Sequence, residues 1–202
     1  MKQLIIFLAI VTAIPVFAQQ VEEPEADTKG KFRKENMFIG GGLNLGAGSG
    51  MFAIGVLPEV GYSVTKWLDA GVSFNLNYQT MREDDYWTGA TYARNRYFNY
   101  GTGVFLRIWP VKFLHLTVQP EYNWINVSRQ LTSTGQKERR TLHAESLLVG
   151  IGYGSREIGN QLSYFTLMID VAQNINSPYR DQYNRADPVF RTGIGFYLGR
   201  RR

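Results

Sequence analysis

Apolar and polar residues alternate along residues 68–79 almost without exception. Even positions carry Leu68, Ala70, Val72, Phe74, Leu76 and Tyr78, and odd positions carry Asp69, Gly71, Ser73, Asn75, Asn77 and Gln79. Successive side chains of a β-strand point to opposite faces, so the pattern predicts a strand with one apolar and one polar face. Its length matches the ~10 residues that a tilted strand needs to cross a bilayer.

The same alternation recurs along the chain and predicts eight strands. Pro58 and Pro120 fall inside two of these segments, and we expect a local bulge at each because proline donates no ladder hydrogen bond. The predicted strands are residues 37–46, 51–64, 67–79, 97–109, 113–127, 142–154, 161–173 and 188–199.

The connections between the predicted strands alternate between short and long. The short connections are residues 65–66, 110–112 and 155–160, and the long polar ones are residues 80–96, 128–141 and 174–187. The first connection, residues 47–50, lies on the side of the long loops but is short. Short turns on one side and longer loops on the other are typical of transmembrane barrels, whose closure pairs every backbone group. The sequence therefore predicts an all-β fold, an eight-stranded antiparallel up-and-down transmembrane β-barrel over residues 37–199.

The chemistry of the two faces indicates which one points inward. The polar face carries charges and many small residues, which suit a narrow lumen, and the apolar face then contacts lipid. Aromatic residues near the strand ends, Trp109 among them, suit the girdles at the membrane interfaces. A lipocalin-like barrel has the opposite arrangement, with an apolar interior and a polar exterior. A secreted soluble barrel or sandwich stays open as the alternative on the alternation alone.

The first residues are typical of a secretory signal. Lys2 is followed by an apolar stretch over residues 4–17, and Ala18 completes a small-x-small cleavage pattern. We expect residues 1–18 to be removed after Ala18, with an uncleaved N-terminal anchor as the alternative. Residues 19–36 are expected to form a flexible charged leader, and residues 200–202 a solvated basic tail.

Composition agrees with an exported barrel. The hydrophobic fraction is 44% but mean hydropathy is −0.23, which fits apolar residues interleaved with polar ones. No later segment is apolar enough for a membrane-spanning helix, and the chain contains no cysteine. The net charge of +5 comes from scattered bases, so we expect no nucleic-acid partner.

Two segments resemble a known family. Residues 57–66, LPEVGYSVTK, lead into WLDAGV at residues 67–72, and residues 190–199 end the last predicted strand. The first pair resembles the second hairpin, and the last segment the closing strand, of small eight-stranded outer-membrane barrels, the OmpA/OmpX-like outer membrane protein beta-barrel domain family. The resemblance implies a barrel in a bacterial outer membrane, and it carries no shared catalytic residues.

Parity assigns a set of ionisable side chains to the lumen. We expect Arg107 opposite His115 across one hairpin and Asp170 opposite Arg191 across the last loop. Unpaired buried charges cost several kcal/mol, so a structural salt-bridge network is predicted, with a narrow proton or ion path as the alternative. Eight strands leave room only for side chains, which argues against a general pore. The full set is Glu59, Asp69, Arg107, His115, Glu121, Asp170 and Arg191.

The long loops and the outer rim hold the remaining candidates. Aromatic residues in the loops suit protein contacts, and His143, Glu145 and Ser146 lie near the rim. No nucleophile–base–orienter set can be assembled from their spacing, so we expect no catalytic residues, metal or cofactor. The predicted role is membrane integrity, or surface adhesion and partner binding through extracellular loops. Alternatives are an accessory part of a secretion or transport machine and a rim enzyme. The loop candidates are Tyr86, Trp87, Tyr92, Tyr179 and Tyr183.

Overall fold

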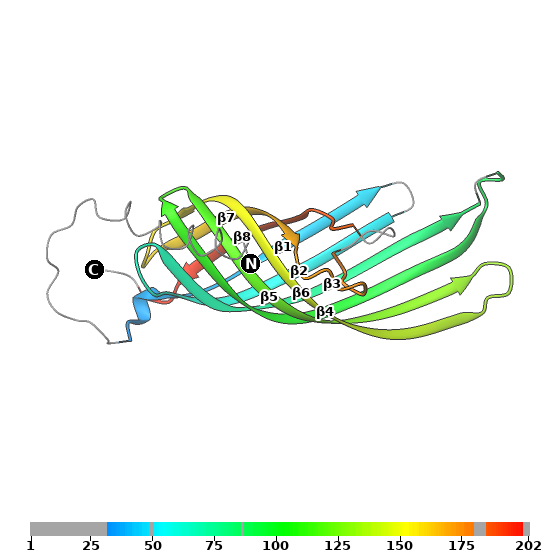
Figure 1. The fold of residues 1–202 in the computed structure, drawn as a ribbon, viewed down its shortest axis with the longest axis horizontal. Helices are drawn as coiled ribbons and strands as arrows, with labels where there is room; N and C mark the ends of the chain where they lie inside the picture. Colours follow the sequence, from blue (N-terminus) through cyan, green and yellow to red (C-terminus); the bar gives the residue numbers. More distant parts are fainter. Residues whose placement is uncertain (1–31, 49–50, 86, 180–184, 200–202) are drawn as a thin grey trace, which may run out of the picture. The chain divides into compact units, whose positions relative to one another are not determined.

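The computed structural model describes residues 32–48, 51–85, 87–179 and 185–199, and the barrel lies within the unit Arg33–Arg202. Each strand pairs antiparallel with the next, and β8 pairs with β1 to close the ring (Figure 1). The predicted eight-stranded antiparallel up-and-down barrel is confirmed. The strands are β1 Met37–Gly48, β2 Met51–Ser63, β3 Leu68–Asp84, β4 Thr91–Val111, β5 Leu114–Leu131, β6 Lys137–Arg156, β7 Gln161–Asp170 and β8 Val189–Tyr197.

Several predictions fall outside the described residues: the signal at 1–18, the tail at 200–202, and most of the leader. The end of the leader is described, and it is not a flexible chain as expected. Lys34–Asn36 form a turn of 3-10 helix, η2. The Arg33 N–H donates to the Tyr62 hydroxyl at 3.1 Å, and the Asn36 amide donates to the Ser63 carbonyl at 3.0 Å. These two contacts fasten the chain to β2 just before the barrel begins.

The alternation along each strand places one set of side chains inside the barrel and the other set on its outer surface. In β7 every second side chain is buried and every other one is exposed along the whole strand. Leu167 and Ile169 are 39% and 47% exposed, whereas Thr166 and Asp170 are each 2% exposed. The barrel thus turns large apolar side chains outward, and its interior holds polar and charged side chains together with apolar ones such as Leu162 and Met168. An exterior this apolar differs from the polar exterior of a lipocalin-like barrel.

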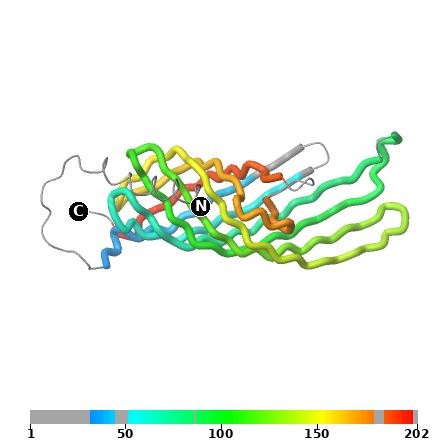
Figure 2. Tube along the Cα trace, in the orientation of Figure 1, coloured from blue at the N-terminus to red at the C-terminus, as the bar shows by residue number. Residues whose placement is uncertain are grey.

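The two ends of the barrel differ. The end with the β2–β3, β4–β5 and β6–β7 connections is here called the turn end, and the opposite one the loop end. At the loop end the β3–β4 and β5–β6 hairpins run past the other strands (Figures 1 and 2). Residues 80–96 and 128–141, predicted as long loops, are therefore mostly strand. Polar residues occupy both faces there, so the alternation that identifies strands is lost.

The prolines cause no bulge, contrary to expectation. The β2–β3 register is unchanged across Pro58, and the β4–β5 register is unchanged across Pro120. Each proline still pairs on its other side, Pro58 with Gly41 and Pro120 with Leu147. A residue in an antiparallel ladder directs its N–H to one neighbour only, so proline interrupts one ladder locally without shifting it.

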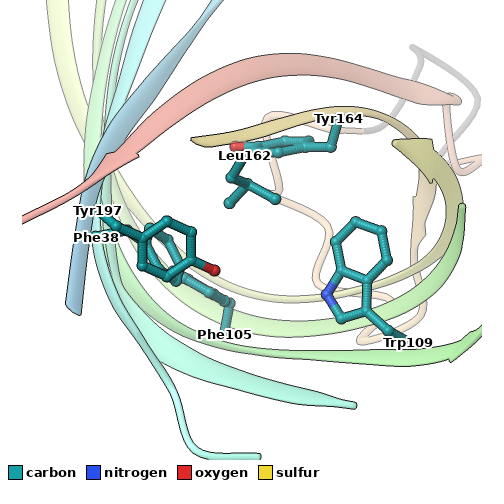
Figure 3. Close-up of a cluster of buried hydrophobic side chains, with 6 residues drawn as sticks. All are labelled: Phe38, Phe105, Trp109, Leu162, Tyr164 and Tyr197. Atoms are coloured by element: carbon teal, nitrogen blue, oxygen red, sulfur yellow. The ribbon is translucent and has the colours of Figure 1, made fainter. Parts of the chain in front are cut away.

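An apolar cluster lies in the interior near the turn end, where the sequence predicted a polar lumen (Figure 3). Trp109, predicted to be one of the interfacial aromatics, is 4% exposed and points inward. The rings of Phe38 and Tyr197 meet edge to face at 5.5 Å, a geometry that aromatic pairs favour. The cluster comprises Phe38, Phe105, Trp109, Leu162, Tyr164 and Tyr197.

In the described part of the chain no helix is long and apolar enough to span a membrane.

Candidate functional site in the barrel interior

The structure places all seven predicted lumen residues inside the barrel, none more than 6% exposed. Five of them form ion pairs, in partnerships that differ from those expected. The described residues contain three ion pairs buried in this interior, joined by hydroxyl and amide side chains. They are Arg156–Asp69, Arg107–Glu59 and Arg191–Glu121.

The central pair joins β4 to β2 across the interior. Arg107 Nη2 lies 3.2 Å from Glu59 Oε2, and the Tyr164 hydroxyl donates to the same oxygen at 2.8 Å. The guanidinium lies 4.0 Å from the centre of the Tyr164 ring, within the range of a cation–π contact. Glu59 is the carboxylate that balances Arg107 among the described residues.

The predicted pairing of Arg107 with His115 is wrong. The β4–β5 register shifts between Ile108 and Val111, so Arg107 lies opposite Thr117. His115 instead pairs with Gly152 of β6, and its Nε2 lies 2.9 Å from the Thr166 hydroxyl. The expected pairing assumed a regular hairpin centred on Val111. The register shift at the turn moves this centre, so the opposite residues change.

The predicted pairing of Asp170 with Arg191 is also wrong. β7 ends at Asp170 and β8 begins at Val189, so the two strands do not form a tight hairpin that would place those residues opposite. Arg191 lies opposite Thr166 and forms its ion pair with Glu121 at 2.9 Å. Asp170 accepts hydrogen bonds from the Leu147 N–H, at 3.0 Å, and from the Ser177 hydroxyl.

The third pair contains a residue that was not predicted. Arg156 Nη2 lies 2.7 Å from Asp69 Oδ1, and its side chain is 4% exposed. Asp69 also accepts from the Trp109 indole at 2.8 Å and from the Ser63 hydroxyl at 2.7 Å. Arg156 was assigned to a turn because β6 was expected to end at residue 154. Gly152 and Gly154 face inward on β6, and Arg156 follows at the same spacing of two residues. This spacing could have predicted its inward position.

Neutral side chains connect the pairs and leave little free space. The Gln119 amide donates to the Ser73 hydroxyl at 2.7 Å and to Glu121 at 2.9 Å. A small cavity among these side chains has room for about one water molecule.

Tyr179 belongs to the interior as well, although it was predicted to be a loop contact. Its hydroxyl donates to Glu121 at 2.7 Å and accepts from Arg191 at 3.0 Å. The connection after β7 therefore places a side chain in the interior that hydrogen-bonds both partners of an ion pair. No residue pattern signals this position, because it follows the last regular strand residue by several positions.

The other loop candidates divide into two groups. Trp87 and Tyr92 are 88% and 48% exposed near the tip of the β3–β4 hairpin. Tyr86 and Tyr183 lie outside the described residues. At the same tip Asp85 accepts from the N–H groups of Thr88 and Trp87, at 2.8 and 3.0 Å. These hydrogen bonds, the one from the Thr88 backbone foremost, hold the pKa of the Asp85 carboxyl below its ordinary value.

Of the rim residues considered for catalysis, His143 and Glu145 share the outward face of β6, whereas Ser146 lies on the opposite face. Ser146 points inward, is 3% exposed and shares a hydrogen bond with Ser177. His143 occupies the outward face, where its ring lies 6.2 Å from that of Tyr122. Among the described residues no group of three metal-binding side chains occurs either.

Comparisons with known proteins give structural likeness alone. No family model and no curated protein matches the sequence. The attachment invasion locus protein Ail of Yersinia pestis is 10% identical, with a TM-score of 0.44, covering 79% of this chain and 94% of its own. Neisserial surface protein A is 10% identical, with a TM-score of 0.43, covering 80% of this chain and 97% of its own.

A major outer membrane protein from Thermus thermophilus is 11% identical, with a TM-score of 0.45, covering 79% of this chain and 97% of its own. Identities and TM-scores this low carry no information on function. The barrel architecture rests on the strand pairing of this chain itself.

Proposed function

We propose that this protein is a non-enzymatic barrel of the bacterial outer membrane that is closed to solutes and displays a protruding sheet for adhesion or partner binding. The outward face supports the membrane location. On β4 the residues from Phe98 to Leu106 that face outward are mostly apolar, and Val104 and Leu106 are 54% and 49% exposed. A contiguous apolar belt of this size is not sustained in water. Lipid is the solvent that accommodates it, and the seven predicted lumen residues then lie inside, whereas Glu145 of β6 is exposed opposite the outward-facing Tyr122.

The closed interior argues against conduction. Three ion pairs and the inserted Tyr179 fill the lumen, and the remaining cavity has room for about one water. Eight-stranded barrels are just wide enough for side chains to fill. The alternative is a narrow proton or ion path. In that case the buried ion pairs conduct charge through the barrel and do not seal it.

The protruding sheet carries the proposal for adhesion or partner binding. β2 pairs with β3 only as far as Met81, and β7 pairs with β6 only from Leu148. Beyond these points β3, β4, β5 and β6 continue as a four-stranded sheet, drawn at the far end of Figure 1. This strand continuation past the apolar belt is the observation on which the proposal rests, because a barrel that only sealed or filled the membrane would not need it.

Truncation of the protruding sheet tests the proposal. Met81 lies opposite Asn95, and Val127 lies opposite Arg140, so residues 82–94 and 128–139 can each be replaced by the two-residue turn Asn-Gly. We expect cells that express the truncated barrel to lose attachment to host cells or to one another while the barrel still inserts. A matched control carries a redesigned turn at residues 64–67, at the other end of the molecule.

The same variants distinguish the second candidate function, membrane integrity. In that case the truncation leaves attachment unchanged, and deletion of the whole protein makes the envelope permeable to a large antibiotic. A secretion or transport accessory would instead co-purify with a stable membrane partner. A rim enzyme would lose a lipid or peptide conversion on His143→Ala. Export through residues 1–18, with cleavage after Ala18, stays a prediction that N-terminal sequencing checks.

A further inference from the structure

The outward face of the protruding sheet carries a group of basic residues just beyond the apolar belt. In the first row across the sheet, Arg96 of β4 and Arg139 of β6 flank Ser128. In the next row outward, Arg82 lies directly opposite Arg94, and Lys137 flanks Gln130 on the far side. All five basic residues are exposed. We call Arg82, Arg94, Arg96, Lys137 and Arg139 the cationic patch.

The patch faces the same side as the apolar belt. On β4, Arg94 and Arg96 share parity with Phe98 and Tyr100, which are 45% and 37% exposed, whereas Asn95 between the two arginines is buried. A strand tilted by ~45° rises roughly 2.3 Å per residue along the membrane normal. Arg96 therefore lies roughly 5 Å, and Arg94 roughly 9 Å, beyond Phe98. This is the depth of the headgroup layer next to the hydrocarbon core.

Within the described residues, the patch has no counter-ion from the protein. Neither row contains a carboxylate, and no ion pair of these five residues occurs in the described part of the chain. Further along the β3–β4 hairpin, beyond the register shift after Glu83, Asp84 accepts from the Thr91 hydroxyl at 2.7 Å. On the opposite face of the same hairpins Arg129 has its own acid, Glu83, at 2.7 Å. The contrast indicates that the outward cations meet an anion from outside the chain.

Like charges directly opposite each other in a sheet are destabilising, and Arg82 and Arg94 are such a pair. An anion between them removes that repulsion, and the planar guanidinium group matches phosphate geometry. We propose that the cationic patch binds the phosphate of an anionic lipid headgroup in the leaflet at the loop end. The acyl chains of that lipid then lie along Tyr78, Phe98 and Tyr100.

The inference rests on the membrane location proposed above, and it is independent of adhesion. The test uses the full mature chain refolded into nanodiscs of phosphatidylcholine containing phosphatidic acid. Native mass spectrometry counts the phosphatidic acid molecules that each barrel retains. The test variant is Arg82→Gln/Arg94→Gln/Arg96→Gln. The matched control, Lys34→Gln/Lys112→Gln/Arg140→Gln, removes the same charge from residues outside the patch, of which Arg140 lies next to Arg139 on the opposite face of β6.

We expect the test variant to retain at least about fivefold less phosphatidic acid than the wild type or the control, since each surface arginine contributes about fivefold to anionic-lipid attraction. Arg82→Lys/Arg94→Lys/Arg96→Lys should restore part of the retention. Equal retention by wild type and test variant overturns the proposal, as does an equal loss in the control. A patch that instead prefers an acidic peptide over phosphatidic acid in competition also overturns it.

Two further measurements keep the outcomes distinct. Wild-type discs of phosphatidylcholine alone receive inorganic phosphate at roughly 10 mM, enough to fill most of a site whose Kd is about 1 mM. Stabilisation by this free phosphate equal to that by phosphatidic acid contradicts a lipid source. Flotation with vesicles and a heat-dependent gel shift report insertion for every variant. Failure of the wild type in those two assays refutes the membrane location, whereas normal insertion without lipid preference refutes only the patch.

Discussion

Removing the carboxylate of Glu59 should destabilise the barrel more than any loss of a surface ion pair. Glu59 is 5% exposed and balances Arg107, which is 3% exposed. In Glu59→Gln the guanidinium stays buried without its counter-charge, because no other acid in the described interior forms an ion pair with it. Removing one partner of a buried pair costs about 3–5 kcal/mol. That is a large part of a total stability of about 5–15 kcal/mol.

The pair between Glu83 and Arg129 provides the matched control. Its atoms are closer, at 2.7 Å against 3.2 Å, yet its side chains are 26% and 44% exposed. Exposed pairs contribute about 0–1 kcal/mol, so Glu83→Gln should cost less than about 1 kcal/mol despite the shorter distance. Burial rather than distance is therefore the variable that sets the difference.

A double substitution separates loss of the pair from loss of packing. Replacing both buried charges with apolar residues of similar size, as in Glu59→Leu/Arg107→Met, is expected to be nearly neutral, because neither charge is left alone. The free energy of unfolding is measured by urea titration in lipid vesicles, followed by tryptophan fluorescence and by the folded band on a gel. A loss below about 1 kcal/mol in Glu59→Gln, or a loss equal to that in Glu83→Gln, refutes this reasoning.

Three further predictions concern the plug, the barrel seam and the hairpin tip. Tyr179→Phe removes both hydrogen bonds to the Glu121–Arg191 pair and should raise amide hydrogen exchange across residues 171–179 while leaving β7 protected; unchanged exchange would mean that the hydroxyl does not fasten the loop. Gly42→Ala would press a Cβ into the Thr192 carbonyl oxygen, whereas the nearest atom to a Cβ at Gly195 is 3.5 Å away. The folded gel band should therefore disappear in Gly42→Ala and persist in Gly195→Ala, and equal folding of the two contradicts the β1–β8 seam. Thr88→Val should raise the pKa of Asp85 by removing the hydroxyl donor at 2.9 Å. Since the folded pKa of Asp85 lies below the ordinary value, the stability it gives the turn is present above that value and is lost as pH falls; carboxyl NMR titration that gives the same pKa in both proteins would disprove this role.

The sequence predicts where the strands lie and which of their faces points inward. It does not predict which buried side chains form ion pairs with each other. Alternation assigns a residue such as Arg107 to the interior because parity depends only on the strand. Its partner depends on the register of two hairpins and on the width of the barrel. The irregularity between Ile108 and Val111, which no residue pattern announces, moves Arg107 from His115 to Thr117. Its carboxylate, Glu59, lies two strands away in the ring.

The protruding sheet and the plug were missed for different reasons. Past the apolar belt polar residues occupy both faces of β3, so Arg82 and Glu83 give no apolar–polar alternation although both lie in a strand. Tyr179 lies in an irregular connection, where side-chain direction follows from the fold of the loop and not from a period. Trp109, in the interior of the turn end, was predicted to be interfacial because residue type was weighed above parity.

The most direct test is to measure whether lipid or water surrounds each outward position of β4 in a lipid vesicle. The chain contains no cysteine, so single cysteines at even positions from 94 to 106 can be spin-labelled one at a time. Collision rates with oxygen, which concentrates in lipid, and with a water-soluble nickel complex are then compared. We expect oxygen-dominated collisions from 98 to 106 and a change to nickel-dominated collisions at 96 and 94. Nickel access along the whole series would contradict a membrane-embedded barrel.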